Sequence, residues 1–151
     1  MKKINILLVD RDNEDHLIVQ TALDEVSYKT KLKTENDREK IFEVLKECET
    51  PDVIFYDIHF PITQDYAIIK KLRAIKRFRH IPLVIYTGWY DPTTLETLYN
   101  LGANLYIKKL LEFFSVKKVI EKVLAIISGK EKQLWLRENF LFGIHELEER
   151  A

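Results

Sequence analysis

Residues 4–9 read Ile4-Asn-Ile-Leu-Leu-Val9, a short apolar run that ends directly at a carboxylate, Asp10. Similar short runs recur at residues 53–56, 83–86 and, less cleanly, 105–107. Runs of this length, rich in β-branched residues, are typical of strands rather than helices. Because most of them are continuously apolar instead of alternating, we predict strands that are covered on both faces, as in a parallel sheet.

Segments with the spacing of amphipathic helices lie between and after these runs. Apolar residues recur three or four positions apart in the segments 17–26, 41–48, 68–75, 95–101 and 113–127. A weaker strand, about residues 29–34, fits between the first two of these helices. The repeated order of strand then helix predicts an α/β fold, with one open, five-stranded, doubly wound parallel sheet of the flavodoxin-like type.

Composition narrows the class of protein. A chain of 151 residues with 46% hydrophobic content is expected to form one domain with a sizeable core. Lys plus Arg equals Asp plus Glu at 24 each, so we expect no nucleic-acid partner. The only cysteine, Cys48, cannot form an internal disulfide, and no stretch approaches the roughly 18 apolar residues of a membrane span. We therefore expect a cytoplasmic protein with no membrane contact.

Polar residues follow four of the predicted strands. In open α/β sheets, ligands bind in the crevice outside the carboxyl ends of the strands. The residues at these ends are Asp10-Arg11-Asp12, Asp57, Thr87-Gly88 and Lys108-Lys109. Carboxylates, a hydroxyl and an ammonium in one place suit phosphoryl transfer, in which an aspartate can be the nucleophile and fixed positive charge neutralises the transferring oxygens. Alternatively, Asp10 and Asp57 could merely cap helices.

Over about residues 3 to 128 the chain resembles the receiver domains of bacterial two-component response regulators. The matching segments are ILLVD at 6–10, PDVIFYDIHFP at 51–61, IPLVIYT at 81–87 and GANLYIKK at 102–109. The resemblance implies that Asp57 accepts a phosphoryl group, that Thr87 hydrogen-bonds it and that Lys109 pairs with it. It also implies a histidine kinase or phosphotransfer protein as phosphodonor, and an output protein that the sequence does not identify.

The same resemblance implies a Mg²⁺ site and a switch residue. Asp10, Asp57 and the backbone carbonyl of His59 would be metal ligands. Tyr106 resembles the aromatic residue of the family that moves inward or outward together with the threonine at position 87, although a plain core role for this tyrosine is equally open.

Position 11 departs from the family pattern. Receivers normally place two adjacent acids after the first strand, and the second acid binds Mg²⁺ directly, but this chain has Arg11 there. A guanidinium could occupy the place of the metal and pair with Asp57. Alternatively, Asp12 could turn inward and restore a ligand. We expect Mg²⁺ binding to be possible but weakened by the arginine.

Two further positions differ from the family. Leu110 stands where the family usually has proline, so the usual cis peptide is not expected there, because a non-proline cis bond costs roughly 3 to 4 kcal/mol. After Pro61 the chain reads Ile-Thr-Gln-Asp65 and lacks the usual glycine. That turn must therefore differ, or it must hold Asp65 in a strained conformation.

The chain extends beyond what five strand-helix units need. We expect a receiver domain over residues 1–128 and a C-terminal helical extension over residues 129–151. Leu136, Phe140, Ile144 and Leu147 form one helical stripe, which Gly143 interrupts. The extension either packs on its own domain or contacts a second chain, so a homodimer through this segment is possible.

Three functions compete at this stage. The first is a single-domain response regulator, not an enzyme, that is phosphorylated on Asp57 and signals by protein contact. The second is a pseudo-receiver, a binding module held in one state by Arg11. The third is a phosphatase of the haloacid-dehalogenase type, in which Asp10 would be the nucleophile and Asp12 the acid/base. The third leaves Asp57 without a role, and beyond Lys109 we find no strand followed by the later pair of acids that this type requires.

Overall fold

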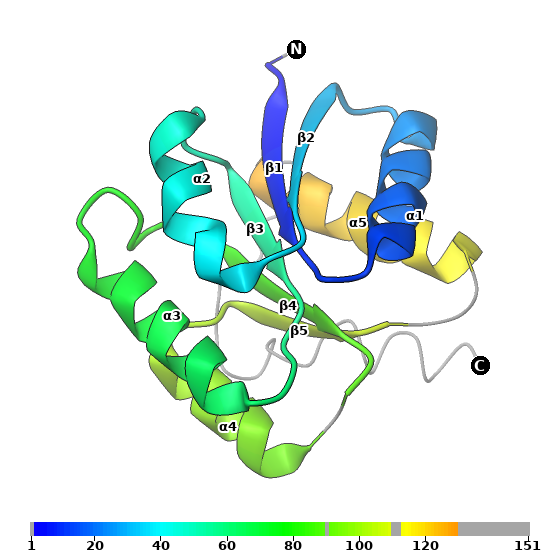
Figure 1. The fold of residues 1–151 in the computed structure, drawn as a ribbon. Helices are drawn as coiled ribbons and strands as arrows, with labels where there is room; N and C mark the ends of the chain where they lie inside the picture. The colour runs from blue at the N-terminus through cyan, green and yellow to red at the C-terminus, as the bar shows by residue number, and fades with distance from the viewer. Residues whose placement is uncertain (1, 90, 110–112, 130–151) are drawn as a thin grey trace.

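The computed structural model describes residues 2–89, 91–109 and 113–129. Its strands are β1 (Ile4–Val9), β2 (Thr30–Glu35), β3 (Val53–Tyr56), β4 (Leu83–Thr87) and β5 (Leu105–Lys108). Its helices are α1 (Asn13–Glu25), α2 (Ile41–Glu47), α3 (Ile62–Ala74), α4 (Pro92–Leu101) and α5 (Phe113–Ile127), with a short 3-10 helix, η1 (Arg38–Lys40), before α2. Strands and helices alternate along the chain (Figure 1).

The strands form one sheet in the order β2-β1-β3-β4-β5, and every neighbouring pair is parallel. The predicted α/β class and five-stranded sheet are therefore confirmed. The weaker strand begins at Thr30, one residue later than expected, and α3 begins at Ile62, well before the segment 68–75 that the apolar spacing marked. The first turn of α3 contains polar residues at positions 63–65, so the apolar spacing did not mark it as helical.

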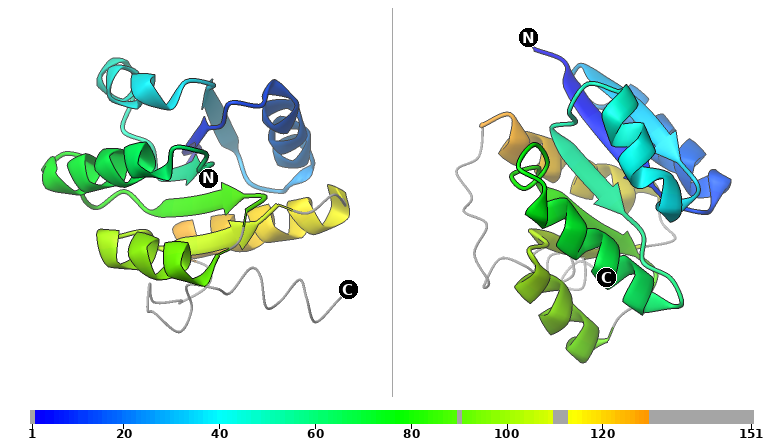
Figure 2. Two further views of the ribbon diagram at one scale, coloured as in Figure 1. Left: turned by 60° about the horizontal axis from the view of Figure 1, so that its bottom comes forward. Right: turned by 60° about the vertical axis from the view of Figure 1, so that its left-hand side comes forward.

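Helices cover both faces of the sheet, which explains the continuous apolar runs. Successive residues of a strand point to opposite faces. Ile6 and Leu8 therefore pack in one core cluster with residues of α1 and α5, whereas Leu7 and Val9 pack in another with residues of α2, α3 and α4. The left view of Figure 2 shows the sheet between these two layers.

Hydrogen bonds continue just past the strand ends and align them. The backbone N–H of Asp57 donates to the carbonyl of Val9 at 2.9 Å, and that of Lys109 donates to the carbonyl of Thr87 at 2.7 Å. These bonds extend the β1·β3 and β4·β5 ladders by one step. As a result, the residues that follow β1, β3 and β5 meet at the same edge of the sheet.

Two sequence predictions fall outside the described residues. The helical extension over 129–151, apart from Gly129, and the peptide bond before Leu110 belong to segments whose structure is not described. Among the helices of the described residues, none combines the length and the apolar character that crossing a membrane requires.

Candidate functional site

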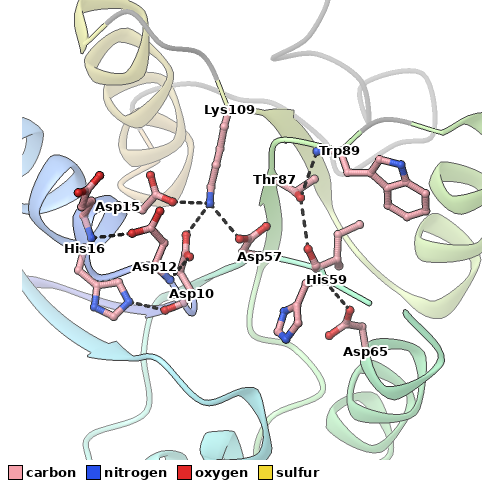
Figure 3. Close-up of polar contacts among 12 residues, drawn as sticks. Asp10, Asp12, Asp15, His16, Asp57, His59, Asp65, Thr87, Trp89 and Lys109 are labelled. Carbon is pink, nitrogen blue, oxygen red and sulfur yellow. Dashed lines mark hydrogen bonds and ion pairs between the residues drawn. The ribbon is translucent and has the colours of Figure 1, made fainter. Parts of the chain in front are cut away.

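The carboxyl ends of four strands bring together the residues predicted from the sequence (Figure 3). Asp10 follows β1, Asp57 follows β3, Thr87 ends β4 and Lys109 follows β5. The side chain of Asp10 is fully buried, while 12% of the Asp57 side chain and 17% of the Lys109 side chain are exposed. The carboxylate of Asp57 is therefore the one that a second molecule can approach more easily.

The ammonium of Lys109 lies at the centre of three carboxylates. Its Nζ atom is 2.7 Å from Asp10 Oδ2, 2.9 Å from Asp57 Oδ2 and 2.7 Å from Asp15 Oδ2. The sequence reasoning did not select Asp15. A signal was available, because this acid lies in the first turn of the helix that directly follows the first strand end.

Burial and ion pairing act in opposite directions on the Lys109–Asp10 pair. Burial raises the pKa of Asp10 to about 6, against the lowering effect of its hydrogen bonds with Lys109 and with the Asp12 N–H. Burial by itself would lower the pKa of Lys109, but its hydrogen bonds to Asp10 and Asp15 outweigh this and raise it. At neutral pH the lysine and this carboxylate therefore form a charged pair.

Neither alternative suggested for positions 11 and 12 describes the structure. Arg11 is exposed, and the ion pair of Asp57 among the described residues is made with Lys109, so the suggested Arg11–Asp57 pair is wrong. Asp12 does not turn inward. It is the N-cap of α1, and its side chain accepts a hydrogen bond from the Glu14 N–H at 2.9 Å.

Thr87 and Tyr106 are both buried beside the site. The Thr87 hydroxyl donates a long hydrogen bond of 3.5 Å to the Ile58 carbonyl and accepts one of 3.4 Å from the Trp89 N–H. The hydroxyl of Tyr106 donates to the Trp89 carbonyl. The tyrosine therefore occupies the inward position, and it contacts the segment that begins at Thr87.

A cavity of about 310 Å³ opens next to Asp57. It is lined by Arg11, Asp57, Ile58, His59, Phe60, Thr87, Gly88 and Trp89. The ring of Phe60, 74% exposed, lies 5.3 Å from that of Trp89 between centroids. The cavity thus combines a carboxylate, a hydroxyl, a cation and an aromatic rim.

A buried ion pair supports the loop after Asp57, and the sequence reasoning missed it. Arg38 in η1 and Asp65 in α3 are 6% and 0% exposed, and they lie 3.0 Å apart. Asp65 also accepts hydrogen bonds from the hydroxyl of Tyr56 at 2.5 Å and from the His59 N–H at 3.0 Å. The guanidinium of Arg38 donates to the His59 carbonyl at 2.7 Å. One ion pair therefore holds both polar groups of the backbone at position 59.

The turn after Pro61 leads directly into a helix. Helix α3 begins at Ile62, and Asp65 lies within it. No residue other than glycine has a positive φ in the part of the chain that the structure describes. The turn therefore differs from the family pattern, and the alternative of a strained Asp65 is wrong. Burial raises the pKa of Asp65, against the lowering effects of Tyr56, the His59 N–H and Arg38.

The ligand set that the resemblance implies for Mg²⁺ is engaged by donors of the protein itself. Asp10 accepts from Lys109 and, at 2.9 Å, from the Asp12 N–H, and Asp57 accepts from Lys109. The His59 carbonyl accepts from Arg38. Within the described ranges, no three acidic, histidine or cysteine side chains are placed to hold a metal ion. In this arrangement the residues do not fit a magnesium centre, and Lys109 neutralises the carboxylates instead.

Comparison with solved structures identifies the fold. The phosphorylated cyanobacterial phytochrome response regulator RcpA superposes with a TM-score of 0.76 at 18% identity, covering 87% of this chain and 98% of that one. The chemotaxis response regulator CheY4 of Vibrio cholerae gives a TM-score of 0.67 at 19% identity, covering 81% of this chain and 99% of that one.

Sequence relatives agree with this comparison. A chemotaxis protein CheY homolog of Campylobacter jejuni is 25% identical over 127 residues, which span 84% of this chain and 97% of the relative. The probable methanogenesis regulatory protein FilR2 of Methanothrix harundinacea is 22% identical over 139 residues, 89% of this chain and 84% of the relative. The family model of the response regulator receiver domain matches residues 6–121, most of the chain. The chain therefore belongs to the response regulator receiver domain family, a family of signalling domains.

Proposed function

We propose that this protein is a response regulator that accepts a phosphoryl group on Asp57 from a histidine kinase or phosphotransfer protein and signals by protein contact. The observation that carries the proposal is the Lys109 ammonium 2.9 Å from the carboxylate of Asp57, which itself lines an open cavity of about 310 Å³. A cytoplasmic location accords with the single Cys48 and with the nature of these partners.

The chemistry follows from the arrangement. An oxygen of Asp57 attacks the phosphorus atom, a new O–P bond forms, and the bond from phosphorus to the donor breaks with its electron pair leaving on the donor. Lys109 supplies fixed positive charge to the transferring oxygens. The hydrogen bond that the Thr87 hydroxyl donates to the Ile58 carbonyl is long, at 3.5 Å, so the hydroxyl can turn to donate to a phosphoryl oxygen instead.

Phosphorylation is tested by incubation with a small phosphodonor and Mg²⁺, followed by mass spectrometry of the intact protein. We expect the wild type to gain the mass of one phosphoryl group and Asp57→Asn to gain none, because Asp57 is the carboxylate that lines the cavity. A gain of the same mass by the Asp57→Asn variant would show that the assignment of the acceptor is wrong.

The pseudo-receiver is the second candidate. Two features favour it: Arg11 stands at the position of the missing acid, and three carboxylates already accept the N–H groups of the Lys109 ammonium. A wild-type protein that gains no phosphoryl mass at any Mg²⁺ concentration would support it. The phosphatase alternative finds no support, because the exposed side chain of Asp12 caps α1. Hydrolysis of a generic phosphomonoester by the wild-type protein would instead support the phosphatase.

We also propose that the C-terminal extension is a surface through which two copies of the chain contact each other. Its sequence is unusually apolar for a solvated tail. Deleting residues 130–151 is expected to lower the apparent mass in solution by more than the deleted segment accounts for, or to expose apolar surface that binds a hydrophobic dye. Light scattering and dye fluorescence measure these effects. If neither changes, the segment does not act as a contact surface.

A further inference from the structure

We propose that Asp15 is a positioning residue: it is the third carboxylate around the Lys109 ammonium, and it helps to hold that ammonium against Asp57. The inference deepens the proposed function and rests on it for its effect on phosphorylation. The contact itself can be tested separately.

Each N–H group of the Lys109 ammonium has a carboxylate acceptor. A lysine ammonium has three N–H groups and no acceptor. Three carboxylate oxygens lie within 2.9 Å of the Nζ atom, and they come from the end of β1, the first turn of α1 and the end of β3 (Figure 3). A free lysine side chain populates many rotamers, and ordering it in one of them costs conformational entropy. Asp15 and Asp10 together engage two donors, which directs the third to Asp57.

Local structure explains why Asp15 reaches this place. Asp12 caps α1, and the Asp15 N–H donates to the Asp12 carbonyl at 3.1 Å, so the helix turns immediately after the strand end. This turn places Asp15 next to Lys109, with only 20% of its side chain exposed. Glu14, its neighbour in the same turn, is exposed. Two adjacent acids of one helix turn therefore differ in whether they contact the lysine.

Charge balance explains why a third carboxylate matters here. With Arg11 in place of an acid, the site without Asp15 would contain two carboxylates, Asp10 and Asp57, and two cations. Asp15 restores a third carboxylate, and it does so at Lys109 rather than at position 11. The lysine is therefore held as firmly as three charge-assisted hydrogen bonds allow, although the adjacent acid of the family is absent.

The contact is tested by a double-mutant cycle with Asp15→Asn and Lys109→Met, measured as urea unfolding of all four proteins. We expect the effect of Asp15→Asn on the folding equilibrium constant to differ at least about fivefold between the Lys109 and Met backgrounds, as for a hydrogen bond between charged groups. The matched control is Glu14→Gln, which removes the same charge from the same helix turn and should show a ratio near one. A ratio near one for Asp15 as well would overturn the proposal.

The positioning role is tested by the rate of phosphorylation with a small phosphodonor, under conditions where every variant is folded. We expect Asp15→Asn to be roughly three- to tenfold slower than wild type and Glu14→Gln to be unchanged. An Asp15→Asn rate equal to wild type would overturn the positioning role. If the wild type itself is not phosphorylated, the proposed function fails, while the cycle still decides whether Asp15 holds Lys109.

Discussion

Arg38→Met is expected to lower the free energy of unfolding by about 3 to 5 kcal/mol, because it leaves a buried carboxylate without its cation. Asp65 is 0% exposed and cannot recover solvation by a small side-chain movement. The variant also removes the donors to the His59 carbonyl and, at 2.7 Å, to the Gln64 side chain. Methionine has a similar length and fills most of the volume, so the loss reports on polar interactions more than on a cavity. Urea unfolding at neutral pH measures it.

Arg79→Met is the matched control for this prediction. Arg79 is exposed, and its side chain makes none of the hydrogen bonds or ion pairs recorded within the described residues. Its substitution should change stability by less than about 0.5 kcal/mol. If Arg38→Met were no more destabilising than Arg79→Met, the buried ion pair would not contribute to the fold in the way its burial indicates.

Arg11→Asp is expected to tighten Mg²⁺ binding at least about tenfold, because it exchanges a positive charge for a carboxylate close to the metal position of the family. A guanidinium offers only donors, whereas Mg²⁺ needs oxygen ligands in an octahedral shell. At an effective dielectric of about 20, one unit charge and a divalent ion roughly 5 Å apart interact by several kcal/mol before desolvation is subtracted. Calorimetry or the fluorescence of Trp89, which lines the same cavity, measures the affinity.

The control for Arg11→Asp is Lys108→Asp, which reverses a charge at the same edge of the sheet. Lys108 is exposed and does not line the cavity beside Asp57, so screening by solvent should leave a much smaller change in Mg²⁺ affinity. Equal affinity in the Arg11→Asp variant and the wild type would contradict the prediction, and it would mean that position 11 lies outside the reach of the ion.

Local sequence was sufficient to predict the parallel sheet of this protein and the residues at its carboxyl edge. The continuous apolar runs predicted buried parallel strands, because a strand covered on both faces needs apolar side chains at consecutive positions. Once the strands were placed, the rule that ligands bind at their carboxyl ends selected the positions 10–12, 57, 87–88 and 108–109. The resemblance to receiver domains then selected Asp10, Asp57, Thr87 and Lys109 among them, and the structure brings these four together.

The pairing of charges was decided only by the tertiary structure. Lys109 meets Asp15 across 94 positions of sequence, and Arg38 meets Asp65 across 27. Neither contact leaves a periodic signal, because a charged residue in a polar segment reads the same whether it is solvated or buried in an ion pair. The pairing of Arg11 with Asp57, one of the two alternatives for this position, was wrong for this reason. Its charge suited the carboxylate, but Lys109 reaches the same oxygen from the end of β5, and a local pattern does not contain the distance that decides between the two cations.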